Sequence, residues 1–169
     1  MFATVVPDAL ALLSDEVRAR VVISQQCRPA DLEQVKARYV ELGIKADLQS
    51  FFTDVPERLA AAHLVIARAG ASTLAEVTAA GRPAILVPYP HAIDDHQTAN
   101  AHALDEVGGG WLMPQEAFTA ESLAKRLTSL LDLPAALTKA AACAKAAGRP
   151  DAAARLADVV TGLIRREAA

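Results

Sequence analysis

The chain has 169 residues, of which 53% are hydrophobic and only 4% aromatic. This length supports one domain whose core is built mainly from Ala, Val, Leu and Ile. The net charge of −3 argues against a nucleic-acid partner, which would require clustered basic residues. The only two cysteines, Cys27 and Cys143, have no metal-site or redox spacing, as is usual in a reducing compartment. No apolar run is long enough for a membrane-spanning helix.

Short apolar runs predict five strands, at Val21–Gln25, Ala46–Phe51, Leu64–Ala67, Ala84–Val87 and, more weakly, Gly110–Met113. Apolar residues at helical spacing predict the helices Val5–Leu13, Pro29–Leu42, Val55–Ala62, Thr73–Ala80, Asp95–Val107 and Ala120–Leu131. Strands that alternate with helices of this length indicate βαβ units. The predicted fold is therefore α/β, with a Rossmann-like parallel sheet and helices on both faces.

The chain after Leu133 is alanine-rich and helical, and Gly148-Arg149-Pro150-Asp151 interrupts it. The final helix, residues 150–167, has one apolar stripe, formed by Leu156, Val159, Val160, Leu163 and Ile164. Such a stripe is typical of a helix that covers a core. A membrane-surface helix is less favoured because the polar face is not strongly basic.

The first candidate binding segment follows the third predicted strand, where an arginine and several small residues lead into a helix. Ligands of parallel α/β sheets bind beyond the carboxyl ends of the strands, and a helix N-terminus there favours phosphate. A carboxylate one turn into the helix could bind a ribose diol. We therefore select as candidate ligand-binding residues Arg68, Gly70, Ala71, Ser72, Thr73, Leu74, Ala75 and Glu76. The alternative is that Thr73 and Glu76 form only a capping box.

The second candidate segment, His91–Asn100, follows the fourth predicted strand, so it lies at the same edge of the sheet. Its many donors and acceptors suit a sugar. Two alternatives compete: a capping box formed by Asp94 and Gln97, and a metal site formed by the His and Asp side chains. The metal site is disfavoured because its groups crowd one loop and no second cluster completes a shell.

The third candidate is the aromatic pair Phe51-Phe52 at the end of the second predicted strand. Adjacent strand residues point to opposite faces, so both rings cannot enter one core. One aromatic could form the wall of a base pocket. The alternative is that one ring is in the core and the other is partly exposed.

With these segments in view, the chain resembles the C-terminal domain of the bacterial undecaprenyldiphospho-muramoylpentapeptide β-N-acetylglucosaminyltransferases. The resemblance covers residues 4–167. The most specific motifs are Arg68-Ala-Gly-Ala-Ser-Thr-Leu-Ala-Glu76 and Pro90-His-Ala-Ile-Asp-Asp-His-Gln-Thr-Ala-Asn-Ala101. The runs Gln25–Pro29 and Gly148–Asp151 are similar to the family as well.

The resemblance implies a role for each candidate residue. The backbone of Phe52 would meet uracil, and residues 71–76 would surround the diphosphate, with Glu76 on the ribose hydroxyls and Arg68 beside them. His96 and Gln97 would face the GlcNAc hydroxyls, with Asn100 on the same helix. His96 replaces a glutamine found in some relatives.

The resemblance also implies the C-terminal half of a GT-B glycosyltransferase that transfers GlcNAc from UDP-GlcNAc to lipid I, without metal or cofactor. The implied location is peripheral, on the cytoplasmic side of the bacterial inner membrane. The acceptor would bind through an N-terminal domain, and no catalytic residue is assigned here. The chain lacks the family's first strand and glycine loop, so residues 1–169 are expected to be an incomplete UDP-GlcNAc-binding domain that is unstable alone.

Two other functions remain open at this stage. One is a non-catalytic UDP-GlcNAc-binding subunit that needs a membrane partner. The other is a different GT-B-type enzyme acting on a UDP-sugar, which would share the segment around Gly70–Glu76 but not the Asp94–Asn100 run.

Overall fold

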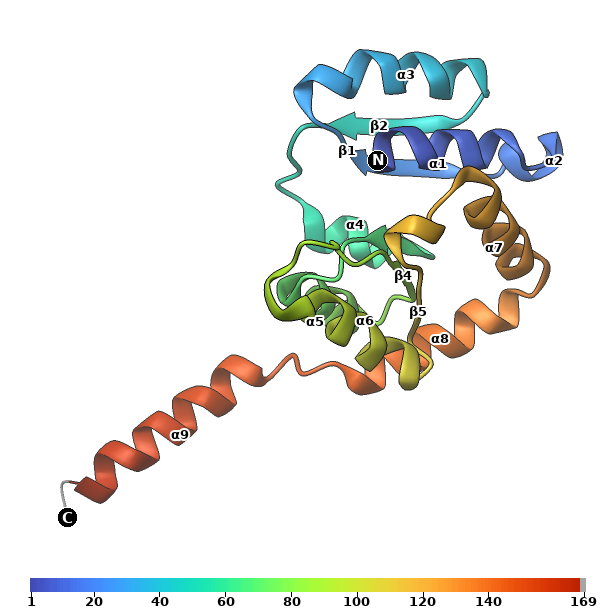
Figure 1. The fold of residues 1–169 in the computed structure, drawn as a ribbon. Coiled ribbons are helices and arrows are strands. Elements are labelled where there is room, and N and C mark those ends of the chain that lie inside the picture. Colours follow the sequence, from blue (N-terminus) through green and yellow to red (C-terminus); the bar gives the residue numbers. More distant parts are fainter. Residues whose placement is uncertain (168–169) are drawn as a thin grey trace.

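The computed structural model describes residues 1–167 as parallel strands flanked by helices (Figure 1). The strands are β1 (Val22–Gln26), β2 (Lys45–Gln49), β3 (Val65–Ala67), β4 (Ala84–Leu86) and β5 (Gly110–Leu112). The α-helices are α1 (Phe2–Ala11), α2 (Asp15–Arg18), α3 (Leu32–Glu41), α4 (Val55–Ala61), α5 (Ala71–Ala80), α6 (His96–Glu106), α7 (Ala120–Asp132), α8 (Pro134–Ala147) and α9 (Ala152–Glu167). Short 3₁₀ turns are η1 (Pro29–Asp31), η2 (Ile93–Asp95) and η3 (Gln115–Ala117).

All five predicted strands are present, and every strand pair is parallel. The first helix begins at Phe2 rather than at the predicted Val5. The helix α2 was not predicted; it is a single turn whose N-cap residue Ser14 accepts a hydrogen bond from the Val17 N–H. Local capping, rather than an apolar stripe, defines this turn.

The strands form two sheets within the described part of the chain, β1–β2 and β3–β4–β5. Both sheets contribute to one core. Ile23 of β1, Ile66 of β3 and Ile85 of β4 belong to the same apolar cluster. This cluster is covered by residues of α1, α3 and α7, including Leu10, Tyr39 and Leu123.

The opposite face of the three-stranded sheet is covered by α5, α6 and α8. Leu86 of β4 points to this face and packs with Val77, Leu104 and Ala144. Successive residues of β4 therefore enter cores on opposite sides, which explains why this strand is apolar throughout and fully buried. The predicted arrangement, a parallel sheet with helices on both faces, is confirmed.

Two glycines allow this close packing. Gly81 ends α5 in the left-handed conformation, with φ of 63°, as expected of a helix C-terminus. Gly110 begins β5 so close to β4 that a Cβ atom there would lie 2.5 Å from the Ala84 carbonyl oxygen. A side chain at position 110 would therefore push the two strands apart.

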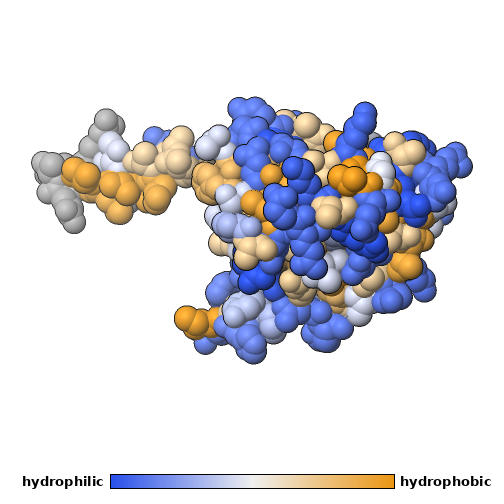
Figure 2. All heavy atoms as spheres, turned by 90° about the horizontal axis from the view of Figure 1, so that it is seen from above, coloured by the Kyte–Doolittle hydropathy of each residue, from blue (hydrophilic) through white to orange (hydrophobic). Residues whose placement is uncertain are grey.

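The prediction that the final helix covers the core is wrong for the described chain. In Figure 1, α9 extends away from the body, and Figure 2 shows apolar side chains along it. Leu156 and Ile164 are 64% and 62% exposed. The physical reason is that α5, α6 and α8 already occupy the nearby sheet face, and Gly148 packs against the Thr78 carbonyl before the chain turns outward. None of the described helices has the length and apolarity needed to cross a membrane.

We predict that the unpaired edge of β3 exchanges amide hydrogens faster than the central strand. The Val65 N–H donates to the Pro83 carbonyl, and the Ala67 carbonyl accepts from the Val87 N–H. Because alternate residues of a parallel strand bond to the same neighbour, the Ile66 N–H points away from β4. Hydrogen exchange followed by NMR should show Ile66 exchanging well before Ile85. Equal protection of the two amides would contradict the unpaired edge.

Candidate functional site

The carboxyl ends of β3, β4 and β5 lie at one edge of the sheet because these strands are parallel. The segments that leave this edge carry most of the predicted binding residues. We call this group the strand-end site, and define it as Arg68, Gly70–Thr73, Glu76, His96, Gln97 and Asn100. Hydrogen bonds between these segments show how the edge is built.

Arg68 connects the ends of all three strands. Its Nη1 donates to the carbonyls of Val87 and Pro88, at 3.2 and 2.8 Å, and its Nη2 donates to Gln115 Oε1 at 2.7 Å. None of the ion pairs among the described residues includes Arg68. Its Nε–H and second Nη2–H also have no acceptor there. The guanidinium is therefore a fixed, uncompensated positive charge, and two of its five N–H donors remain available.

The surroundings of Arg68 are partly apolar. The rings of Phe2 and Tyr89 each lie 5.4 Å from the guanidinium carbon. Burial lowers the pKa of Arg68, yet an arginine side chain remains charged at any physiological pH. A cation held in a partly desolvated place attracts an anion more strongly than one in water.

The α5 N-terminus starts next to Arg68. Gly70 is the N-cap residue and provides no side-chain cap, so the N–H groups of Ala71, Ser72 and Thr73 have no helical acceptor. Asn100 of α6 fixes this turn, because its Nδ2 donates to the Ala69 carbonyl at 2.9 Å. Free N–H groups at a fixed helix start form an anion site.

Neither of the two capping boxes considered as alternatives is formed. Because α5 begins at Ala71, Thr73 lies inside the helix rather than at its N-cap. The Glu76 carboxylate is exposed and has no hydrogen bond or ion pair within the described residues. The start of α6 likewise has Asp95, not Asp94, as its N-cap, with no bond from the side chain to the backbone. Glu76 and Gln97 are therefore not committed to capping.

The loop before α6 is conformationally strained. Asp94 and Asp95 both have positive φ angles, 52° and 50°. Such angles are uncommon for residues other than glycine, although aspartate tolerates them better than most. The Asp95 carboxylate accepts from the Thr98 hydroxyl at 2.7 Å, which helps to fix the loop. The positive φ angles of this loop were not visible in the sequence.

His96 and Gln97 are oriented by contacts with the backbone. His96 Nδ1 lies 2.7 Å from the Ile93 carbonyl oxygen, to which it must donate, so in the neutral ring Nε2 is an acceptor. Gln97 Oε1 accepts from the Tyr89 N–H at 3.0 Å, so its NH₂ group remains as a donor. The pair thus presents one acceptor and one donor, which suits the hydroxyl groups of a sugar.

Phe52 lies apart from this group. It follows β2 rather than ending it, its ring is only 5% exposed, and Arg58 stacks on it with a guanidinium-to-centroid distance of 3.6 Å. Arg58 is held by Asp47 and Asp54, at 2.7 Å each. Phe51, in contrast, is 71% exposed. One ring is therefore buried and the other exposed, so the Phe52 side chain does not form an open wall for a base.

Leu74 and Ala75 are also placed differently from the prediction. Leu74 packs on the core cluster beneath α5, and with Ala75 it lines a groove of about 300 Å³ that also involves Ala103 and Leu104 of α6. Their side chains therefore face α6 rather than the strand ends. The Leu74 N–H is also engaged, because it donates to the Gly70 carbonyl within α5.

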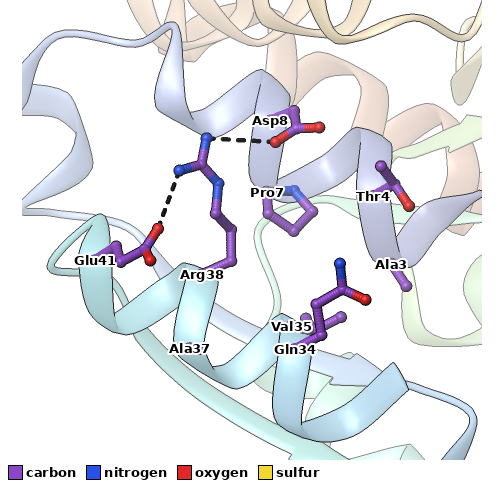
Figure 3. A pocket seen from close by; sticks show the side chains of 9 residues that line it. All are labelled: Ala3, Thr4, Pro7, Asp8, Gln34, Val35, Ala37, Arg38 and Glu41. Atoms are coloured by element: carbon purple, nitrogen blue, oxygen red, sulfur yellow. Dashed lines mark hydrogen bonds and ion pairs between the residues drawn. The ribbon is translucent and has the colours of Figure 1, made fainter. Parts of the chain in front are cut away.

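A second groove, of about 340 Å³, lies between α1 and α3. Figure 3 shows Arg38 bridging Asp8 and Glu41 across it, with N–O distances of 3.4 and 3.2 Å. The single guanidinium of the described lining is paired with two carboxylates, so this groove has a net negative charge and no unpaired cation for an anionic ligand. No group of three potential metal ligands occurs among the described residues, at the His/Asp loop or elsewhere.

Sequence reasoning did not select Gln115 or Tyr89, although both contact predicted site residues. Gln115 follows β5 and Tyr89 follows β4. These positions could have identified them, because every strand end at this edge can contribute to a binding site. Gln115 was overlooked because the fifth strand is short and weakly patterned.

Residues 1–156 match the model of the glycosyltransferase family 28 C-terminal domain. The chain belongs to this family. It is thus a domain of a glycosyltransferase family, as its motifs predicted. The fold prediction, the C-terminal half of a GT-B glycosyltransferase, is confirmed as well.

The similar proteins agree with this assignment. The chain is 65% identical over 161 residues to the UDP-N-acetylglucosamine–N-acetylmuramyl-(pentapeptide) pyrophosphoryl-undecaprenol N-acetylglucosamine transferase of Rhodospirillum rubrum, covering 95% of this chain and 42% of that protein. The crystal structure of Acinetobacter baumannii MurG matches with a TM-score of 0.84 and 31% identity, over 95% of this chain and 46% of that one. The chain therefore spans less than half the length of these relatives.

A more distant structure shares the fold alone. The calicheamicin glycosyltransferase CalG4 matches with a TM-score of 0.56 at 18% identity, over 88% of this chain and 44% of that chain.

We predict that Asn100→Ala destabilises the domain by about 1–3 kcal/mol, because it leaves the Ala69 carbonyl without its donor. The free energy of unfolding in urea measures this loss. His102→Ala, at an exposed position of the same helix, is the matched control and should change stability little. Equal stabilities of the two variants would show that Asn100 does not fix the turn.

Proposed function

We propose that this chain binds the UDP-GlcNAc donor of an enzyme that transfers GlcNAc to undecaprenyl-diphospho-N-acetylmuramoyl-pentapeptide, converting lipid I to lipid II. The names of the similar transferases support this substrate pair. The observation that carries the proposal is the combination of an uncompensated Arg68 with the free N–H groups of α5 at one sheet edge.

The diphosphate of the donor would bind between Arg68 and the α5 N-terminus. The N–H groups of Ala71–Thr73 and the positive end of the helix dipole favour its negative charge. The hydroxyls of Ser72 and Thr73 add two further donors beside them. Negative charge grows on the UDP leaving group during transfer, so these fixed donors would bind the transition state more tightly than the bound donor.

The ribose and the sugar would contact the remaining residues of the site. The exposed Glu76 carboxylate can accept hydrogen bonds from the two ribose hydroxyls. His96 Nε2 and the Gln97 NH₂ group supply an acceptor and a donor for the GlcNAc hydroxyls. Uracil would meet the backbone of Phe52, whose position Arg58 stabilises.

The acceptor and the location of the enzyme belong to the same proposal. Lipid I is membrane-bound, so the complete protein would act at the cytoplasmic face of the inner membrane as a peripheral enzyme. The lipid would be bound by a part of the enzyme outside this chain. We therefore assign no catalytic base to residues 1–169.

Calorimetric titration of UDP-GlcNAc into the chain tests the proposal, with UDP-glucose as the competing donor. We expect UDP-GlcNAc to bind more tightly. Glu76→Ala should weaken binding of UDP-GlcNAc about tenfold or more, because it removes hydrogen bonds to a charged group.

The matched control is Glu106→Ala, which removes an exposed carboxylate at the far end of α6 and should leave binding unchanged. Absence of binding by the unmodified chain, under conditions where circular dichroism shows it to be folded, would overturn the proposal. Equal binding by the Glu76 and Glu106 variants would remove Glu76 from the site.

A further inference from the structure

Gln115 is fixed in place by structure on both sides of it. It begins the η3 turn, in which the Ala117 N–H donates to the Pro114 carbonyl at 3.0 Å. Phe118, directly after the turn, is 3% exposed, and its ring packs edge-on against Phe2 at 5.3 Å. The side chain of Gln115 is therefore held at the edge of the sheet by a buried anchor.

The contact that Gln115 makes is with a cation, yet Gln115 is neutral. Its Oε1 accepts from Arg68 Nη2 at 2.7 Å, the shortest of the three hydrogen bonds of that guanidinium. All three acceptors of Arg68 are uncharged oxygen atoms. Each of them orients the guanidinium without cancelling its charge.

The residue after Gln115 in the sequence, Glu116, has a carboxylate. Glu116 is exposed, and none of the described ion pairs includes it. A glutamate at position 115 would bond Arg68 more strongly than glutamine does, because charge-assisted hydrogen bonds are roughly twice as strong as neutral ones. The residue that contacts Arg68 is therefore the neutral Gln115, which bonds a guanidinium less strongly than a carboxylate would.

We propose that Gln115 is a positioning residue for the donor diphosphate: it orients Arg68 while leaving the positive charge of the guanidinium available to the ligand. This inference rests on the proposed function. A carboxylate at position 115 would compete with the diphosphate for the same cation. Stability would then rise while donor affinity falls. A substitution at a purely structural residue would not produce these opposite changes.

The test exchanges the residues at positions 115 and 116. The variant Gln115→Glu/Glu116→Gln has the same composition and net charge as the natural chain, and Glu116→Gln alone is the control. The probes are UDP, by calorimetry, and uridine, by NMR titration. In the exchanged variant we expect UDP affinity to fall about tenfold or more, while uridine affinity stays unchanged.

Thermal unfolding provides the second readout. The exchanged variant should unfold about 2–4 °C higher than the Glu116→Gln control, because residue 115 now forms an ion pair with Arg68. In an Arg68→Met background this gain should disappear. Gln115→Ala should lower both the unfolding temperature and UDP affinity, because it removes the contact without adding charge.

Three results would overturn the inference. The first is UDP affinity in the exchanged variant equal to that of the control, and the second is an equal loss for UDP and uridine. The third is a gain in unfolding temperature that persists in the Arg68→Met background. If the natural chain binds no UDP, the proposed function itself fails, and the unfolding temperatures still decide whether residue 115 acts on Arg68.

Discussion

The guanidinium of Arg68 organises the carboxyl edge of the sheet. It lies at the end of β3, bonds the backbone beyond β4, and reaches the turn beyond β5, so one side chain connects three strand ends. Because none of these contacts is with a carboxylate, the cation that stabilises the edge also remains able to bind an anion. The packing of this edge, and the anion binding proposed for it, thus depend on one uncompensated charge.

A second constraint comes from the edges of the strands. Within residues 1–167, β1 bonds only β2 and β3 bonds only β4, although residues of both sheets enter the same core. Backbone N–H and C=O groups at such edges require partners or water. The domain therefore combines a well-packed three-stranded half, which carries the strand-end site, with a two-stranded half that is attached to it through side chains. Phe52 follows the two-stranded half, so a ligand that meets both Phe52 and Arg68 would connect the two halves.

The sequence predicted what depends on local pattern. Apolar runs located all five strands, and the small residues after Arg68 located the start of α5 to within two residues. It could not predict which polar side chains would bond each other, because Gln97 meets Tyr89 and Arg68 meets Gln115 only through the tertiary fold. The final helix shows the same limit. An amphipathic pattern identifies an apolar face but not the surface that it meets, so α9 is a helix as predicted yet does not cover this core.

The most direct test of this account is to locate UDP on the folded chain by NMR, following backbone amides and arginine side chains during a titration. We expect the largest shifts at the Arg68 side chain and at the amides of Ala71–Thr73, with little change in the groove between α1 and α3. Shifts concentrated around Arg38 in that groove, with Arg68 unaffected, would contradict the claim that the carboxyl edge of β3–β5 is the nucleotide site.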